Sequence, residues 1–265
     1  MSLTVNTNIE AMDAQRNLNS TESALSTSME RLSSGLRINT AADDVAGYAI
    51  SQKLQGQING LGQAQQNTQD AVSLAQTAQG SLNEVEQMLQ RVRELAVQYK
   101  NGTNSESSKE AIVSEVGQLS SEIERVGTTT QFNGISLLKE EAAITFQVGA
   151  NDGEVISVST ISLGAAVGTI SLSKATALEE IDTAIGKVSA SAGEFGAVQN
   201  RLQYTQSNLA TYDQNLSAAQ SSIVDVDMAS EMTNFTKDQV LEQAGVAVLS
   251  QANQLPQAVL KLLNG

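Results

Sequence analysis

The sequence contains no cysteine and no histidine. Without cysteine the chain has no disulfide, no thiol nucleophile and no thiolate ligand for zinc. Without histidine it lacks the side chain that most often exchanges protons near neutral pH. These two absences exclude cysteine-based zinc sites and every catalytic mechanism that relies on imidazole or thiolate chemistry.

Aromatic residues and proline are also scarce: there are four Tyr, four Phe, no Trp and a single proline, Pro256. Aromatic side chains supply the largest buried areas in compact cores, so a thick globular interior is disfavoured. Ala, Leu, Val and Ile must therefore do the packing, which suits thin bundles of long helices. The near absence of proline favours the same architecture, because proline is the strongest helix breaker.

Targeting and membrane-spanning segments are not found either. Residues 1–10 have no basic region and no apolar core, so we expect no cleavable secretory signal. No stretch approaches the roughly 20 consecutive apolar residues of a transmembrane helix, so we expect no membrane insertion. If the protein leaves the cell, it requires another export route.

The net charge of −14 argues against nucleic acid as a partner, because phosphate binding requires clustered Lys and Arg. The charge is unevenly distributed: residues 1–40 carry about −1, residues 227–265 about −2, and the middle about −11. We interpret the ends as buried against something and the centre as facing water. Acidic residues on solvated helix faces explain the centre equally well, but they do not explain the contrast.

Three central runs of apolar residues repeat about every 3.5 residues. This spacing is typical of helices that pack as a left-handed coiled coil or bundle. Gly102, between Asn101 and Thr103, separates the first run from the second and predicts a helical hairpin. The runs are Ala71, Ala75, Ala78, Leu82, Val85, Leu89, Val92, Ala96 and Tyr99; then Ile112, Val116, Leu119, Ile123 and Val126; then Phe195, Val198, Leu202, Leu209, Tyr212, Leu216, Ala219, Ile223 and Val226.

Each end of the sequence carries an apolar seam with the same spacing. Neither seam has the bulk of a core, and isolated helices of this kind are marginal in water. We therefore expect the ends to pack against each other or against neighbouring molecules. Pro256 either kinks or terminates the second helix. The seam positions are Leu18, Leu25 and Leu32, with Met29 and Leu36 in alternate slots, and then Leu241, Gly245, Val248, Ala252, Leu255, Val259 and Leu262.

One region has the composition of a sheet. Residues 144–148 and 155–163 are β-rich runs around the turn at 149–153, which predicts a small hairpin between the helical halves. Ser and Thr are plentiful from Ser157 to Thr176, so O-glycosylation there stays an open alternative without a readable motif.

The search for catalytic motifs gives almost nothing. There is no phosphate-binding loop, and Gly60-Leu61-Gly62 lacks the third glycine of a dinucleotide site. The Asp43-Asp44 pair has two interpretations, a metal or acid–base site or part of a helix cap. We favour the cap, because Thr40 and Asp43 match the capping box that starts a helix. We predict no catalytic residue, no cofactor and no metal.

Several long motifs, in the same order, resemble those of the bacterial flagellin family. Together they cover residues 1–138 and 175–265, whereas many relatives carry larger outer domains in the middle. The motifs are ERLSSGLRIN at 30–39, TAADDVAGYAIS at 40–51, LQRVRELAVQ at 89–98, TQFNG at 130–134, GAVQNRL at 196–202 and LPQAVL at 255–260.

The resemblance implies a mainly α fold: a long-helix coiled-coil bundle formed by the N- and C-terminal halves, with a small β-hairpin insertion. It assigns residues 1–43 with 225–265 to a terminal coiled coil that lines the inner tube of a filament. Residues 44–134 with 175–224 form the helical bundle, and residues 135–174 form the hairpin-bearing insertion. The polymerisation seam then comprises Leu18, Leu25, Leu32, Leu36, Leu241, Val248, Leu255, Val259 and Leu262.

The implied function is that of a structural subunit, not an enzyme, that polymerises with copies of itself into the extracellular flagellar filament. The resemblance further implies unfolded export through a type III channel and partners in an export chaperone, the cap protein and the hook–filament junction proteins. A junction protein is the nearest alternative identity. Relatives with a central protease domain are set aside, because the chain has no histidine for an H-E-x-x-H site.

The resemblance also implies a host partner, Toll-like receptor 5. The family's contact positions correspond to Arg91 and Leu95, with Glu115 on the following helix. Arg91 and Leu95 are four residues apart and share a helix face. Alternatively, Leu95 widens the core stripe and Arg91 pairs with Glu94 or Glu115.

Overall fold

The computed structural model describes residues 7–263, and the side chains of residues up to 254. By their contacts the residues form two compact units, which are described separately. The first unit comprises the residues up to Gly56 together with those from Leu216 onward, and the second comprises Gln57–Asn215. Long helices dominate both units, as the apolar spacing predicts. None of the described helices has an apolar stretch sufficient to cross a membrane.

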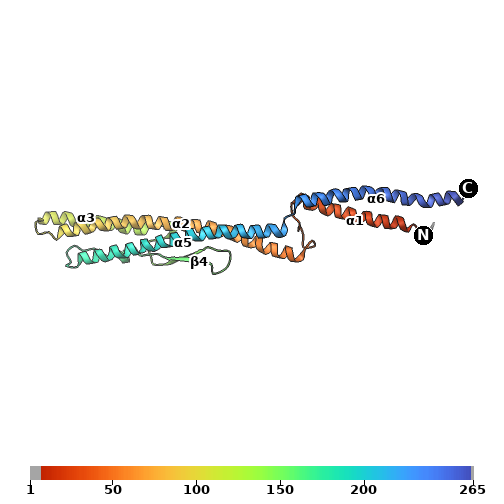
Figure 1. Cartoon of the computed structure of the whole chain (residues 1–265). Helices are drawn as coiled ribbons and strands as arrows, with labels where there is room; N and C mark the ends of the chain where they lie inside the picture. Colours follow the sequence, from red (N-terminus) through yellow and green to blue (C-terminus); the bar gives the residue numbers. More distant parts are fainter. Residues whose placement is uncertain (1–6, 264–265) are drawn as a thin grey trace. The chain divides into compact units, whose positions relative to one another are not determined.

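The first unit contains two helices that lie side by side, α1 (Ile9–Ser34) and α6 (Met228–Leu263) (Figure 1). The side chain of Asn8 caps α1 by accepting the N–H of Ala11 at 3.1 Å. The helix ends at Gly35, whose φ of 74° is the left-handed conformation that favours glycine. Helix α6 extends past Pro256, so of the two alternatives for this proline, termination is wrong.

Backbone hydrogen bonds hold the loop after α1 against the junction between α5 (Ala177–Val224) and α6. Leu36 and Asp225 form an isolated antiparallel bridge. The N–H of Arg37 donates to the carbonyl of Val224 at 2.6 Å, and the N–H of Val226 donates to that of Gly35 at 3.0 Å. The entrance and the exit of the first unit are therefore joined by main-chain bonds, which do not depend on side-chain identity.

The start of α2 (Val45–Tyr99) corrects the predicted capping box. A carboxylate oxygen of Asp43 does accept the N–H of Thr40, at 2.8 Å, which is one half of such a box. The helix, however, begins at Val45, and the residue that caps it is Asp44. Its side chain accepts the N–H groups of Ala46 and Gly47, both at 3.0 Å. Both carboxylates therefore have structural roles at this helix start.

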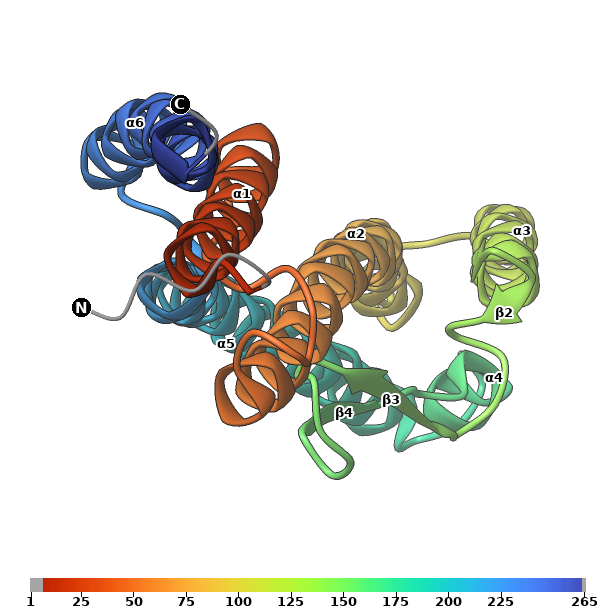
Figure 2. The same ribbon diagram turned by 90° about the vertical axis from the view of Figure 1, so that its right-hand side faces the viewer.

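The second unit is a helical bundle built from α2, α3 (Glu106–Thr129) and α5 (Figures 1 and 2). The chain between α2 and α3 turns at Gly102, as predicted, and Ser105 caps α3. The predicted stripe of α2 is buried from Ala71 to Ala96, while Tyr99 is half-buried. Phe195 of α5 is fully buried and is among the largest buried side chains. The core is thus a line of aliphatic contacts along the helix axes.

The predicted hairpin is present as β3 (Ala143–Gln147) and β4 (Val155–Ser159), which pair antiparallel (Figure 2). Alternate residues of β4, Ile156 and Val158, are buried in the same core as the helices. The second strand ends earlier than predicted. Residues 160–163 leave the sheet because Ser162 caps the short helix α4 (Leu163–Val167), which the sequence analysis did not predict.

A second, two-residue hairpin precedes it, formed by β1 (Gln131–Phe132) and β2 (Ile135–Ser136). Its turn is Asn133-Gly134, and both residues have positive φ, 49° and 80°. Asn-Gly is the commonest sequence of a two-residue hairpin turn. The structural signal was therefore present in the TQFNG motif, although only the family resemblance was taken from it.

Candidate functional site

The inner face between α1 and α6 consists mostly of small and polar residues. Buried or half-buried positions recur every three or four residues on both helices, as in a coiled coil. A carbon built at Cβ of Gly245 would lie 3.3 Å from Cδ1 of Leu18. The α1 positions are Ala11, Ala14, Leu18, Thr21, Leu25, Ser28 and Leu32; the α6 positions are Glu231, Phe235, Asp238, Glu242, Gly245, Leu249 and Ala252.

The predicted seam residues of α1 lie on this inner face, with one exception among the alternate slots. Leu18, Leu25 and Leu32 are half-buried, whereas Met29 is 55% exposed and the buried residue in its place is Ser28. Leu36 is half-buried but lies beyond the end of α1, in the bridge to Asp225. The N-terminal seam is therefore an internal contact of the subunit.

The predicted seam of α6 does not form a single buried face. Gly245 is half-buried and Ala252 is buried, but Leu241 and Val248 are 46% and 57% exposed. Packing against α1 places Phe235 and Leu249 inward instead and turns the bulkier positions outward. The side chains of the remaining three positions, Leu255, Val259 and Leu262, lie outside the described residues.

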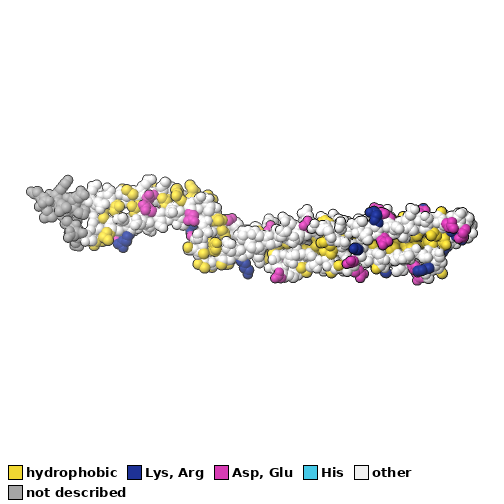
Figure 3. All heavy atoms as spheres, turned by 180° about the vertical axis from the view of Figure 1, so that it is seen from behind, with side chains coloured by type: hydrophobic (Ala, Val, Ile, Leu, Met, Phe, Trp, Pro, Cys, Tyr) yellow, Lys and Arg dark blue, Asp and Glu magenta, His cyan; other side chains and the backbone are white. Residues whose placement is uncertain are grey.

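The outward side of α6 carries a row of exposed aliphatic residues, which we call the outer face of α6. It consists of Val240, Leu241, Val246 and Val248, each between 46% and 59% exposed. A shallow groove runs along its first part, lined by Met232, Thr233, Thr236, Lys237, Val240 and Leu241. Figure 3 shows hydrophobic side chains at the surface of the α1–α6 unit. Adjacent exposed apolar residues of this kind are typical of protein–protein contact sites.

The residues predicted to contact a receptor are brought together on the second unit, with different accessibilities. Arg91 donates to one carboxylate oxygen of Glu115 from Nε at 3.1 Å and from Nη2 at 2.9 Å. It also donates to Glu94 at 3.1 Å. These hydrogen bonds, first with Glu115 and then with Glu94, raise the pKa of the Arg91 guanidinium above its ordinary value. The three charged side chains are each about half exposed or more.

Leu95 lies in the interior instead. It is 2% exposed and belongs to a core cluster with Val92, Ile112 and Ile181. This burial corresponds to the alternative interpretation of the motif, in which Leu95 widens the core stripe. Direct contact between Leu95 and a partner is therefore wrong for the folded subunit, while Arg91 and Glu115 remain at the surface.

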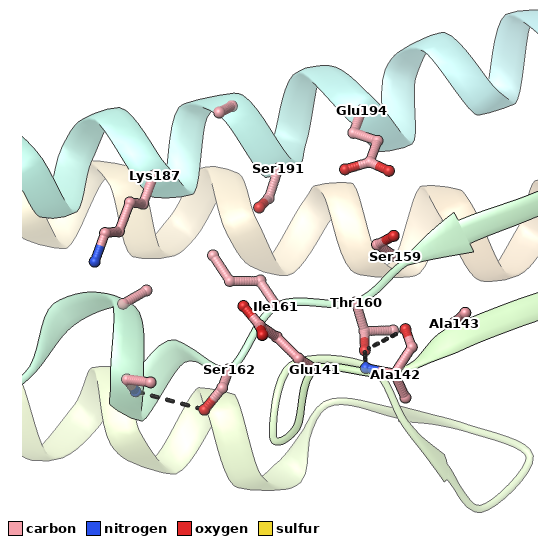
Figure 4. Close-up of a pocket in the computed structure, with 13 residues that line it drawn as sticks. Glu141, Ala142, Ala143, Ser159, Thr160, Ile161, Ser162, Lys187, Ser191 and Glu194 are labelled. Atoms are coloured by element: carbon pink, nitrogen blue, oxygen red, sulfur yellow. Dashed lines mark hydrogen bonds between the residues drawn. The ribbon is translucent and has the colours of Figure 1, made fainter.

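A depression between α5 and the hairpin was a further candidate site (Figure 4). Lys187 and Glu194 of α5 flank it on one side, and Glu141 lies on the other. The hydroxyl of Thr160 accepts the N–H of Ala142 at 2.8 Å and fastens the open end of the hairpin. Across the described residues, no group of three or more acidic side chains is placed to hold a metal ion. The depression therefore has a structural explanation.

Comparison with known proteins gives a consistent match. The bacterial flagellin N-terminal helical region matches residues 5–143, and the C-terminal helical region matches residues 178–263. The chain is 48% identical to a flagellin of Halalkalibacterium halodurans, over 98% of this chain and 99% of that one. It is 42% identical to a flagellin of Bacillus subtilis with the same coverage.

Among solved structures, a flagellin of Bacillus cereus is 32% identical with a TM-score of 0.51, covering 58% of this chain and 94% of that one. A putative flagellar hook-associated protein of Vibrio parahaemolyticus has a TM-score of 0.59 at 13% identity, which is a likeness of fold alone.

Proposed function

The chain belongs to the bacterial flagellin family, and on this premise we propose that it is a structural subunit that self-assembles into the extracellular flagellar filament. Flagellins are structural proteins and not enzymes. The near full-length match to two flagellins supports the filament subunit over the hook–filament junction protein, for which the likeness is one of fold alone. The assembly hypothesis depends on one structural observation, the exposed aliphatic outer face of α6.

The physical argument is the mismatch between the two faces of α6. Its inner face uses Glu231, Asp238, Glu242 and Gly245 against α1, so the internal contact buries little apolar area. Its outer face leaves Leu241 and Val248 in water. Burying exposed aliphatic area is favourable by roughly 25 cal/mol per Å². A second subunit that covers this face supplies the contact which the isolated subunit lacks.

Substitution of Leu241 by Asp tests this proposal. Polymerisation must then bury an unpaired carboxylate, which costs several kcal/mol, so we expect no filament at subunit concentrations at which the unchanged protein polymerises. Gln243→Asp introduces the same charge two residues away, at an exposed polar position, and is the matched control. Light scattering and electron microscopy measure filament formation. Equal polymerisation of the two variants would refute the role of the outer face.

We further propose, from family membership, that the subunit is exported unfolded through the flagellar type III channel with an export chaperone. It is added beneath the cap protein at the distal tip and adjoins the junction proteins at the filament base. Recovery of the secreted protein from the medium of strains with and without the flagellar export apparatus tests the route. Secretion that does not depend on the apparatus would contradict it.

The finer proposal for the bundle is recognition by Toll-like receptor 5 through Arg91 and Glu115, with Leu95 acting from the core. Arg91→Ala removes a guanidinium that is accessible, and we expect weaker receptor binding of the folded monomer. Leu95→Ala also weakens binding, but through loss of packing, so it lowers stability as well. Receptor affinity and thermal unfolding measured on both variants separate these effects. Unchanged affinity of Arg91→Ala would leave that residue with only its ion pairs.

A further inference from the structure

The methionines of this chain are unequally placed. Of the five that lie within the described residues, four are in the first unit and are strongly exposed: Met12 by 57%, Met29 by 55%, Met228 by 48% and Met232 by 50%. The fifth, Met88, is partly buried against the core of the helical bundle. The accessible thioethers are therefore concentrated on α1 and α6.

Met232 also lies beside the proposed contact surface. It lines the same groove as Val240 and Leu241, the first residues of the outer face of α6. A thioether is apolar and adapts to irregular surfaces. Its sulfoxide is polar and needs a hydrogen-bond donor when it is buried. The groove has Lys237 and two threonines at its edge, but its exposed surface next to Met232 is aliphatic.

We propose that Met12, Met29, Met228 and Met232 form an oxidation site at which a hydroperoxide controls self-association of the free subunit. The proposal rests on the proposed function, because it assumes that α1 and α6 carry the subunit contacts. Met232 has the largest effect, since it adjoins the outer face of α6. Once the subunit has assembled, neighbouring subunits cover these side chains, and the sulfur atoms are protected.

The chemistry is a two-electron oxygen transfer. The O–O bond of the hydroperoxide breaks, one oxygen forms a new S–O bond, and hydrogen peroxide leaves as water. The sulfur is oxidised by two electrons and the peroxide is reduced by two. No protein nucleophile or metal is needed. A methionine sulfoxide reductase, supplied with thiol reducing equivalents, reverses the change.

The test begins with oxidation of purified monomer by hydrogen peroxide. Peptide mass spectrometry should detect sulfoxide at the four exposed methionines before it appears at Met88. Light scattering should then show that the critical concentration for polymerisation has risen roughly tenfold, which corresponds to about 1.4 kcal/mol per subunit added. Far-UV circular dichroism should remain unchanged, and reduction by methionine sulfoxide reductase should restore assembly.

Two variants keep the test specific. The fourfold change M12L/M29L/M228L/M232L retains apolar side chains and should polymerise equally well with and without peroxide. Met88→Leu removes the partly buried methionine and should leave the sensitivity to peroxide intact. Met232→Gln places a polar group in the groove without any oxidant and should impair assembly by itself.

Normal polymerisation of the oxidised protein would overturn the proposal. So would equal inhibition of the fourfold Leu variant, or inhibition that accompanies loss of helix content. Failure of the untreated, unchanged protein to polymerise would instead contradict the proposed function. In the assembled filament we expect the four sulfur atoms to oxidise more slowly than in the monomer.

Discussion

Leu18 packs directly over Gly245, at the closest approach of α1 and α6. The space above Gly245 fits a hydrogen atom: a carbon at Cβ would lie 3.3 Å from Cδ1 of Leu18, which is the flexible end of a side chain. Two half-buried residues of opposite size thus set the distance between the two helices. A glycine in a helix interior usually costs about 1 kcal/mol relative to alanine, so its presence here fits a demand for close approach.

Substitution at Gly245 therefore has opposite effects according to size. Gly245→Leu adds bulk that Leu18 cannot vacate, and we expect it to destabilise the α1–α6 pair by about 1–3 kcal/mol. Gly245→Ala gains helix propensity and displaces only the end of Leu18, so it should be nearly neutral. Hydrogen exchange of the α1 amides in the monomer measures the pairing. Equal protection in both variants would mean that the contact does not set the helix distance.

Phe195 carries the corresponding prediction for the bundle. It is fully buried among the aliphatic residues of α2, α5 and the hairpin. Phe195→Ala should lower the free energy of unfolding by about 3–5 kcal/mol, through lost transfer energy and a cavity. Tyr204 of the same helix is 80% exposed, and Tyr204→Ala should change stability by no more than about 0.5 kcal/mol. Urea unfolding compares them. A small loss for Phe195→Ala would show that the bundle is loosely packed there.

Ion pairs predict how the bundle responds to acid. Arg93 donates to Asp182 at 2.6 Å, and this hydrogen bond, with the guanidinium charge, lowers the pKa of the Asp182 carboxyl. Arg125 likewise lowers the pKa of Glu122. Carboxyls whose pKa falls on folding stabilise the protein above their unfolded pKa, about 3.9 for Asp and 4.3 for Glu. That stabilisation is lost as the pH falls through the lower, folded values.

We therefore expect the free energy of unfolding to decrease below about pH 4. Because these groups are exposed, the effect of each is small and weakens with added salt. Asp182→Asn should show a smaller decrease between pH 7 and pH 3 than the unchanged protein. Asp152→Asn removes an equal charge from the hairpin turn and is the control. An unaltered pH dependence in Asp182→Asn would contradict the role of the Arg93 pair.

Periodicity predicted the helical architecture well, because a buried helix face repeats every 3.5 residues whatever it packs against. The stripe from Ala71 to Ala96 and the break at Gly102 follow directly from the sequence. Strand alternation with a glycine-containing turn predicted the β3–β4 hairpin for the same reason. These features depend on local patterns alone.

The site on α6 was harder to predict, because periodicity identifies a face but not its partner. Gly245 and Ala252 belong both to the predicted apolar seam and to the inner face found in the structure. The choice between them depends on α1, whose Leu18 requires a small residue opposite. Phe235 and Leu249 give no strong signal, since acidic residues occupy three of the positions on the same face. Leu95 was ambiguous in the same way, because broad apolar stripes serve cores and contact sites alike.

The central claim is that α1 and α6 carry the contacts between subunits, and hydrogen exchange on monomer and filament tests it most directly. In the monomer the α1–α6 pair buries few large side chains, so its amides should exchange faster than those around Leu82 and Phe195 in the bundle core. On assembly the account predicts a large gain in protection along α1 and along α6, including the stretch from Val240 to Val248. Full protection of both helices in the monomer, or a gain confined to α2, α3 and α5, would contradict it.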